Sequence, residues 1–204
     1  MTNWVSLLNH PLLNVVVFLS SRPIAKFLDL ENPSYLNTLR GIYLGSQLVI
    51  IVLSFYLMSV IKKKNDRTSL RYVEPGGQSW DGTETEDTLV NTTNMANSQS
   101  YLLDYDIDQV KKQMKQSFTG VPVIAFLHLK FGYVQPLLIQ SVMAFKTFFM
   151  SKESRIHFFG GNTSRGELRR PFRIEAPFNM VSEKKQPKTD KGSIKRAEKA
   201  LKAQ

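Results

Sequence analysis

Residues 41–61, GIYLGSQLVIIVLSFYLMSVI, form an apolar stretch without a charged side chain, and Lys62, Lys63 and Lys64 follow it directly. A hydrocarbon layer about 30 Å thick takes roughly 20 helical residues to cross. Inside that layer each backbone N–H and C=O needs a partner in the same segment, so the stretch must be helical. Helices of soluble domains show one apolar and one polar face, which this stretch lacks. The sequence therefore predicts an integral membrane protein organised around this helix.

A second apolar segment, residues 4–20, precedes this span and predicts a short membrane helix. It lacks the basic start and the small-residue cleavage site of a signal peptide. Residues 22–40, which include two prolines, are expected to form a connector. Basic residues favour the cytosolic side of a span, and the lysine run after the main span decides the orientation. We expect a helical hairpin over residues 1–61, with the N-terminus in the cytosol and the connector in the lumen.

Residues 62–118 are expected to form a cytosolic loop followed by a helix. Most of the loop is rich in Gly, Thr, Asn and acidic residues and has too little apolar surface to form a core. The Pro-Gly pair at residues 75–76 favours a type II turn. Residues 104–117 predict a helix that Asp104 or Asp106 caps, because a carboxylate accepts hydrogen bonds from the first N–H groups of a helix.

Residues 119–150 contain two apolar runs that Gly132 and Pro136 separate. At about 1.5 Å per residue, neither run alone crosses about 30 Å of hydrocarbon. One tilted, kinked span and a hairpin of two short helices both fit this pattern. Basic residues flank the region on both sides, which favours a hairpin with both ends in the cytosol.

Polar side chains within residues 119–150 mark a candidate membrane groove. An ionisable residue at membrane depth costs about 3 kcal/mol or more and usually faces protein or a water-filled cavity. Lysines near helix ends can also extend to the lipid headgroups. The two deeper uncharged residues, Gln140 and Ser141, favour a polar face. The candidate groove residues are His128, Lys130, Gln140, Ser141 and Lys146.

Residues 151–204 hold 14 basic and 6 acidic residues and supply most of the net charge of +10. The segment that begins RIHFFGG is expected to form a short strand, a glycine turn and then a basic stretch. The tail predicts a basic helix that Asp190 or Ser193 caps. Such a helix is either simply solvated or contacts RNA or anionic lipid. The candidate contact residues are Lys195, Arg196, Lys199 and Lys202.

The residue inventory argues against enzymatic chemistry. The chain has no cysteine, which excludes disulfides, thiol catalysis and thiolate metal sites. Its three histidines lie far apart in sequence, without the spacing of a metal site. We find no nucleophile–base pair, carboxylate pair or cofactor loop. We therefore expect no enzyme activity, no cofactor and no metal.

Six stretches occur in order along the chain: RYVEPG, LDYDIDQ, IQS, RIHFFG, RRPFR and PKTDKGSIKRAEKA. With them the chain resembles the fungal inorganic phosphate transport family of small endoplasmic reticulum membrane proteins, from about residue 12 to the end. Members of that family also serve as the membrane component of the SRP-independent (SND) targeting route. The resemblance implies receipt of client membrane proteins and their insertion beside the translocon. The older name implies a role in phosphate uptake, direct or through the maturation of phosphate transporters.

The expected fold is an all-α, multi-pass endoplasmic reticulum membrane protein with two helical hairpins, about four membrane segments, the last two short. The expected divisions are residues 1–61, 62–118, 119–150 and 151–204, with the soluble parts in the cytosol. The expected partners are the Sec-type translocon, other targeting components, client membrane proteins, the bilayer and the ribosome. The expected function is nonenzymatic targeting and insertion, and the alternative is a phosphate transport subunit or a maturation factor for phosphate transporters.

Overall fold

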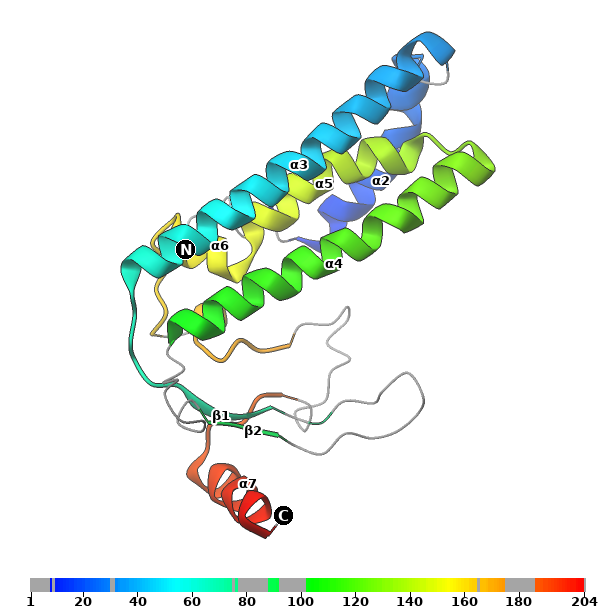
Figure 1. The fold of residues 1–204 in the computed structure, drawn as a ribbon. Helices are drawn as coiled ribbons and strands as arrows, with labels where there is room; N and C mark the ends of the chain where they lie inside the picture. Colours follow the sequence, from blue (N-terminus) through cyan, green and yellow to red (C-terminus); the bar gives the residue numbers. More distant parts are fainter. Residues whose placement is uncertain are drawn as a thin grey trace. The chain divides into compact units, whose positions relative to one another are not determined.

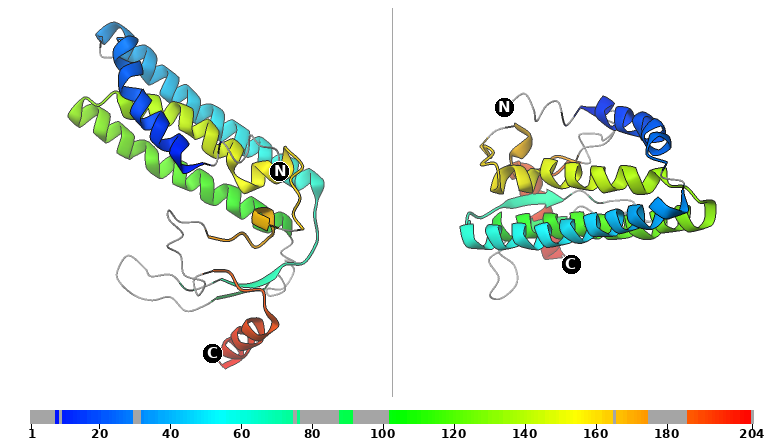
Figure 2. Two further views of the ribbon diagram at one scale, coloured as in Figure 1. Left: turned by 180° about the vertical axis from the view of Figure 1, so that it is seen from behind. Right: turned by 90° about the horizontal axis from the view of Figure 1, so that it is seen from above.

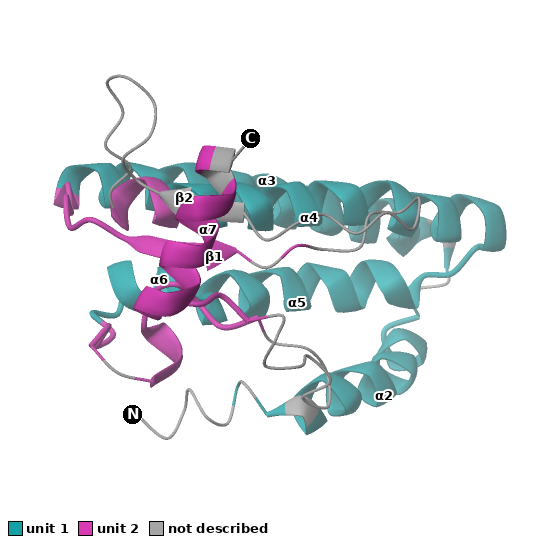
Figure 3. Cartoon of the chain, turned by 90° about the horizontal axis from the view of Figure 1, so that it is seen from below, with its two compact units in different colours: residues 1–63, 107–160 teal, residues 64–106, 161–204 magenta. Residues whose placement is uncertain are grey.

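The computed structural model (Figure 1) forms two compact units. Unit 1 comprises Met1–Lys63 and Ile107–Gly160, and unit 2 comprises Lys64–Asp106 and Gly161–Gln204 (Figure 3). The structure describes residues 8, 10–29, 32–74, 76, 88–91, 102–164, 166–174 and 186–203.

Unit 1 is a helical bundle. Its helices are α2 (Pro11–Phe27), α3 (Pro33–Lys64), most of α4 (Leu102–Phe131), α5 (Gln135–Met150) and the short α6 (Lys152–His157). Helices α3 and α4 run alongside each other, and α5 lies between that pair and α2 (Figure 2). Among the described residues, one helix, Ser34–Lys64, is long and apolar enough to cross a membrane, with a mean hydropathy of 2.1 over its most apolar 18 residues.

Helix α2 continues through Pro23 to Phe27, so the expected connector over residues 22–40 is wrong. A proline inside a helix removes its own N–H donor and crowds the carbonyl four residues earlier, which can kink a helix without ending it. Beyond it the ladder resumes, with the Leu28 N–H donating to the Ile24 carbonyl at 2.9 Å. The helix ends before Asp29, whose φ of 48° lies in the left-handed region that commonly terminates helices. Only residues 28–32 separate α2 from α3.

A break between α4 and α5 lies where the sequence predicted it, at residues 132–134. Gly132 has a φ of 70°, which glycine adopts without a steric cost. Its N–H donates to the His128 carbonyl at 3.0 Å and closes α4. Pro136 lies in the first turn of α5, where its missing N–H is not needed. The break is confirmed, whereas a membrane hairpin at this position stays a prediction.

Helix α4 is longer than expected at its N-terminal side and passes without interruption through residue 119. Its first N–H groups are bound by backbone carbonyls: Leu102 donates to Thr68 at 3.0 Å and Leu103 to Asp66 at 3.2 Å. These carbonyls occupy the place of a capping side chain. Because the helix already begins at Leu102, the predicted capping by Asp104 or Asp106 is wrong.

Helix α6 replaces the strand that the RIHFFGG sequence was expected to form. Ser151 caps it, since the Ser154 N–H donates to the Ser151 Oγ at 3.2 Å. The ring of Phe158 then stacks on Tyr56 with centroids 5.9 Å apart. A cap and a packing site for the aromatic ring thus outweigh the β-propensity of this stretch. The predicted glycine turn is present, because Gly160 has a φ of 64°.

Unit 2 contains a small antiparallel sheet, so the expectation of an all-α chain is wrong in this part. Strand β1 (Arg71–Glu74) pairs with β2 (Thr88–Asn91), and Val73 also bridges to Lys188. Helix α7 (Lys191–Ala203) packs against both strands, and a 3-10 turn, η1, covers Gly166–Leu168. The short apolar pair Tyr72-Val73 is buried, but its strand partners are distant in sequence and left no local pattern to predict it.

Candidate functional site

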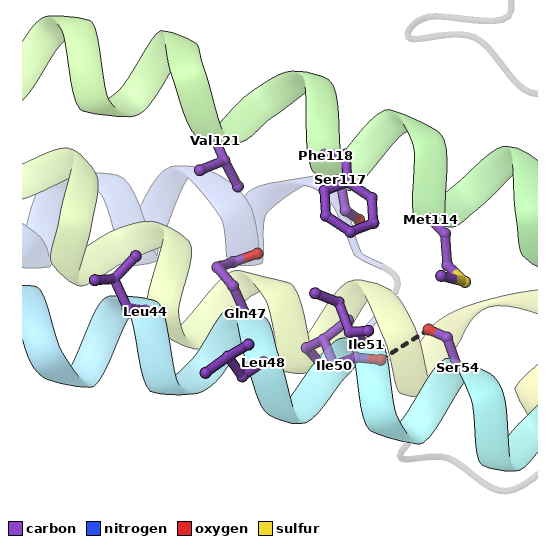
Figure 4. Close-up of a pocket in the computed structure, with 10 residues that line it drawn as sticks. All are labelled: Leu44, Gln47, Leu48, Ile50, Ile51, Ser54, Met114, Ser117, Phe118 and Val121. Atoms are coloured by element: carbon purple, nitrogen blue, oxygen red, sulfur yellow. Dashed lines mark hydrogen bonds between the residues drawn. The ribbon is translucent and has the colours of Figure 1, made fainter.

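Helices α3 and α4 enclose an open pocket of about 270 Å³ within unit 1 (Figure 4). Its lining residues recur every three or four positions, so each helix presents one face to it. The walls are mostly apolar, with an amide and two hydroxyls among them. Helix α3 contributes Leu44, Gln47, Leu48, Ile50, Ile51 and Ser54, and α4 contributes Met114, Ser117, Phe118 and Val121.

A smaller and more polar pocket of about 50 Å³ adjoins the first and extends it to α5. The two share Ile50, Ser54, Met114 and Ser117, and the smaller one is also lined by Gln113, Gln140, Ala144, Thr147 and Phe148. Gln113 Nε2 donates to the Thr147 carbonyl at 3.3 Å, which joins α4 to α5 here. The two pockets together are called the groove below.

Gln47 is the strongest sign that the groove takes a ligand. The residue is 9% exposed, and its Nε2 has no hydrogen-bond partner among the described residues. Its amide extends from α3 toward α4 (Figure 4). The neighbouring Ser54 hydroxyl is already used, donating to the Ile50 carbonyl at 2.8 Å. A buried donor without a partner costs about 1–3 kcal/mol, which a bound acceptor would recover.

The groove lies at the middle of the apolar run 41–61 of α3 rather than at either end. Lys115 of α4 is exposed. It directly follows Met114, which lines the same pocket as Ser54, so Lys115 lies near the level of Ser54. Ser54 lies about 10 Å inside the end of the apolar run, at about 1.5 Å per residue. If α3 crosses a bilayer, a charge at this level needs water or thinned lipid beside α4.

Sequence reasoning missed most of the groove. It singled out Gln140 but not Gln47, Ser54, Gln113 or Ser117. A signal was present in the spacing. Gln47 and Ser54 of α3 are seven residues apart, so they lie on one helix face. Gln113 and Ser117 of α4 are four residues apart and also share a face. That the two faces meet depends on helix packing, which the sequence did not supply.

His128 lies outside the groove, in a hydrogen-bonded cluster near the α4–α5 turn. Arg40 Nε donates to His128 Nε2 at 3.0 Å, and Nδ1 lies 3.0 Å from the Tyr133 carbonyl. A guanidinium is only a donor and a carbonyl only an acceptor. His128 is therefore neutral, with its proton on Nδ1. The buried imidazole thus fixes α3 to the turn that separates α4 from α5.

The other predicted groove residues also have separate places. Ser141 is buried and donates to the Leu137 carbonyl of its own helix at 2.7 Å. Lys146 Nζ donates to Asn14 Oδ1 and so joins α5 to α2. Lys130 is exposed. Of the five predicted residues, the structure places Gln140 alone in the lining of the groove.

The predicted tail helix is present as α7, and the candidate contact residues Lys195, Arg196, Lys199 and Lys202 are all exposed. Asp190 is its cap, because the Ser193 N–H donates to Asp190 Oδ2 at 2.7 Å. Hydrogen bonds from Ser193 lower the pKa of Asp190 below its ordinary value. Arg71 of β1 forms an ion pair with Glu198 of α7.

Comparison with known proteins identifies the family. Residues 8–204 match the family described as Phosphate transport (Pho88). The chain belongs to the Pho88 family. It is 31% identical over 198 residues to SRP-independent targeting protein 3 of Saccharomyces cerevisiae, covering 95% of this chain and 96% of the relative. It is 32% identical over 200 residues to the SRP-independent targeting protein 3 homolog of Schizosaccharomyces pombe, covering 97% and 95%. No solved structure matches the chain.

The Pho88 match includes the stretches that carried the resemblance, and two of them meet in unit 2. The LDYDIDQ stretch supplies Tyr105 and Asp106, and the RRPFR stretch supplies Arg170 and Phe172. Arg170 pairs with Asp106, and the Phe172 N–H donates to the Tyr105 hydroxyl at 2.7 Å. Two of the stretches that carried the resemblance therefore contain residues that stabilise the fold of unit 2.

Proposed function

We propose that this chain is a nonenzymatic component of SRP-independent targeting at the endoplasmic reticulum membrane, which receives client membrane proteins and aids their insertion. Membership of the Pho88 family and the names of two relatives over nearly the whole chain support a role in targeting. The observation that carries the insertion step is the groove, with Gln47 Nε2 unpartnered among the described residues at mid-length of α3, the described helix that is long and apolar enough to cross a membrane.

The groove offers a client segment two kinds of surface. A polar group that enters hydrocarbon without a hydrogen bond costs several kcal/mol. Gln47 and Gln140 can bind such groups, while Leu44, Leu48 and Phe118 contact apolar side chains. A client helix with a polar residue or flank is therefore better accommodated beside α3 and α4 than in lipid alone.

Short helices add to this effect. Helix α5 has 16 residues and α2 has 17, so they are about 24 and 26 Å long. Both are shorter than about 30 Å of hydrocarbon, and lipid thins around short spans. In the proposed arrangement α2 and α5 lie in the membrane with α3 and α4, and the polar flank of the client has a shorter distance to cross. A Sec-type translocon is the proposed neighbour that accepts the client.

The family name is consistent with a second candidate function, that of a phosphate transport subunit or a maturation factor for phosphate transporters. Phosphate sites usually place Arg or Lys donors against the phosphate oxygens. The residues that line the groove are uncharged. The groove therefore fits an apolar segment with polar groups better than a phosphate ion.

Two measurements on the full chain test these functions. Insertion of a client reporter is followed in cells whose own copy is replaced by the Gln47→Leu, Gln140→Leu variant, with exposed Val52→Leu as the control. We expect insertion to fall roughly fivefold for each lost hydrogen bond of about 1 kcal/mol, while Val52→Leu has no effect. Unchanged insertion in the double variant would refute the groove's role. Phosphate flux by the purified protein alone in liposomes would favour the second function.

A further inference from the structure

One row of four lysines follows the exposed side of α7. Lys191, Lys195, Lys199 and Lys202 are spaced by four, four and three residues, so they share one helix face, and each is exposed. Arg196, which the sequence grouped with them, lies on an adjacent face of the helix. The term lysine row below means these four residues.

The opposite side of α7 is already in use within unit 2. The helix packs against β1 and β2. Its start is fixed by the bridge between Val73 and Lys188, whose two N–H···O distances are 2.9 and 3.0 Å. Its second half is fixed by the ion pair between Arg71 and Glu198. These contacts hold the lysine row on the outward side of unit 2.

The charge of the lysine row is not neutralised within the described part of the chain. Glu198 is the single acidic residue of α7, and Arg71 binds it. Among the described residues the four lysines form no ion pair. Like charges at a spacing of four residues repel each other on a helix. An anionic partner would relieve this repulsion along the whole row.

We propose that the lysine row binds the phosphate backbone of an RNA. Four residues of helix advance about 6 Å, so the charges recur at nearly regular intervals along about 17 Å, which suits a polymer with regularly spaced phosphates. A helix that lies in a membrane surface needs a free apolar face. The packed side of α7 is not free, which disfavours lipid. The proposal does not depend on the groove.

The test measures binding of a labelled single-stranded RNA to the full chain in neutral-lipid nanodiscs at several salt concentrations. The variant changes all four lysines of the row to Gln, which keeps a good helix former at each position. We expect binding at low salt to fall at least tenfold. We also expect the slope of log K against log salt to become shallower by about 3, because each lost phosphate contact contributes about 0.7.

Two further variants control for net charge and folding. The first control variant changes Lys62, Lys63, Lys111 and Lys115 to Gln, which removes the same charge from α3 and α4. Its RNA binding should stay within about twofold, with an unchanged salt slope. Changing the lysine row to Arg keeps the charge and should keep RNA binding. Equal losses of RNA binding in the two Gln variants, or no loss in the lysine-row Gln variant, would overturn the proposal. It would also be overturned if the lysine-row Gln variant lost binding to anionic lipid vesicles but kept its RNA binding. The client insertion assay measures a different property, so a failure of the proposed groove function would be distinguished from a failure of RNA binding.

Discussion

Asp106 and Arg170 form a two-pronged ion pair in unit 2, although 64 residues separate them in sequence. Arg170 Nε donates to Asp106 Oδ1 at 2.6 Å, and the two side chains are 6% and 2% exposed. Removing two charges from water is costly, and the cost is offset only while both partners are present. The pair fixes the segment after η1 to the start of α4.

The first prediction concerns this pair. Asp106→Ala leaves the Arg170 guanidinium buried without its partner, and we expect a loss of about 3–5 kcal/mol in the free energy of unfolding of unit 2. Protease resistance of the C-terminal region in the full chain measures this loss. Asp108→Ala removes an exposed carboxylate and should change stability by less than about 1 kcal/mol. Equal effects of the two variants would show that the pair does not stabilise unit 2.

The second prediction concerns the His128 cluster. His128→Phe leaves Arg40 Nε and the Tyr133 carbonyl without their present partner, at an expected cost of about 2 kcal/mol in the free energy of unfolding. Leu129→Ala changes a neighbouring side chain that is 77% exposed and serves as the control. Thermal unfolding in detergent measures both. Nitrogen NMR should show a neutral ring with its proton on Nδ1, and a proton on Nε2 would contradict the assigned hydrogen bonds.

The third prediction is a pH dependence of α7. The pKa of Asp190 is lowered in the folded chain by hydrogen bonds from Ser193, so its ionised form stabilises the helix start. This stabilisation is fully present above the unfolded pKa of about 3.9 and is lost as pH falls through the lower folded pKa. The protection factor of the Ser193 amide, which is its exchange rate relative to that of an unstructured peptide at the same pH, should therefore fall below about pH 4. Asp190→Asn should abolish that dependence, and an unchanged profile in the variant would contradict the capping role.

The fourth prediction concerns topology. The sequences that begin at Asn91 and Asn162 both fit the N-glycosylation pattern, and Asn162 is exposed. We expect neither to be glycosylated, because both should face the cytosol. A flexible insertion with an acceptor sequence between α2 and α3 is the luminal control and should be glycosylated. A glycosidase-sensitive form that Asn162→Gln abolishes would place the C-terminal region in the lumen.

The comparison of sequence and structure shows where local patterns suffice. The Asp190 cap, the α4–α5 break at Gly132 and the apolar α3 were predictable, because capping, turn chemistry and hydrophobic length are local properties. Strand β1 was not, since Tyr72 and Val73 gain their pairing from β2 and from Lys188, which are far away in sequence.

The groove shows the same limit. Gln47 was visible as a polar interruption of the apolar run, but its place in one pocket with Ser117 of α4 depends on how two long helices pack. The sequence placed His128 and Lys146 with Gln140 because all three occur in one segment. Arg40 and Asn14, which bind the first two, come from other helices. Tertiary contacts therefore divided a set that looked continuous in sequence.

The most direct test of the central claim is site-specific photocrosslinking during client insertion. A photoreactive residue is placed at Ser117 in the groove, or at Val16 on α2, which is 59% exposed and does not line the groove. The account predicts that the client's entering segment crosslinks at position 117, that the adduct disappears when insertion is complete, and that position 16 captures little. Equal capture at the two positions, or none at position 117 during active insertion, would contradict the claim that the groove receives clients.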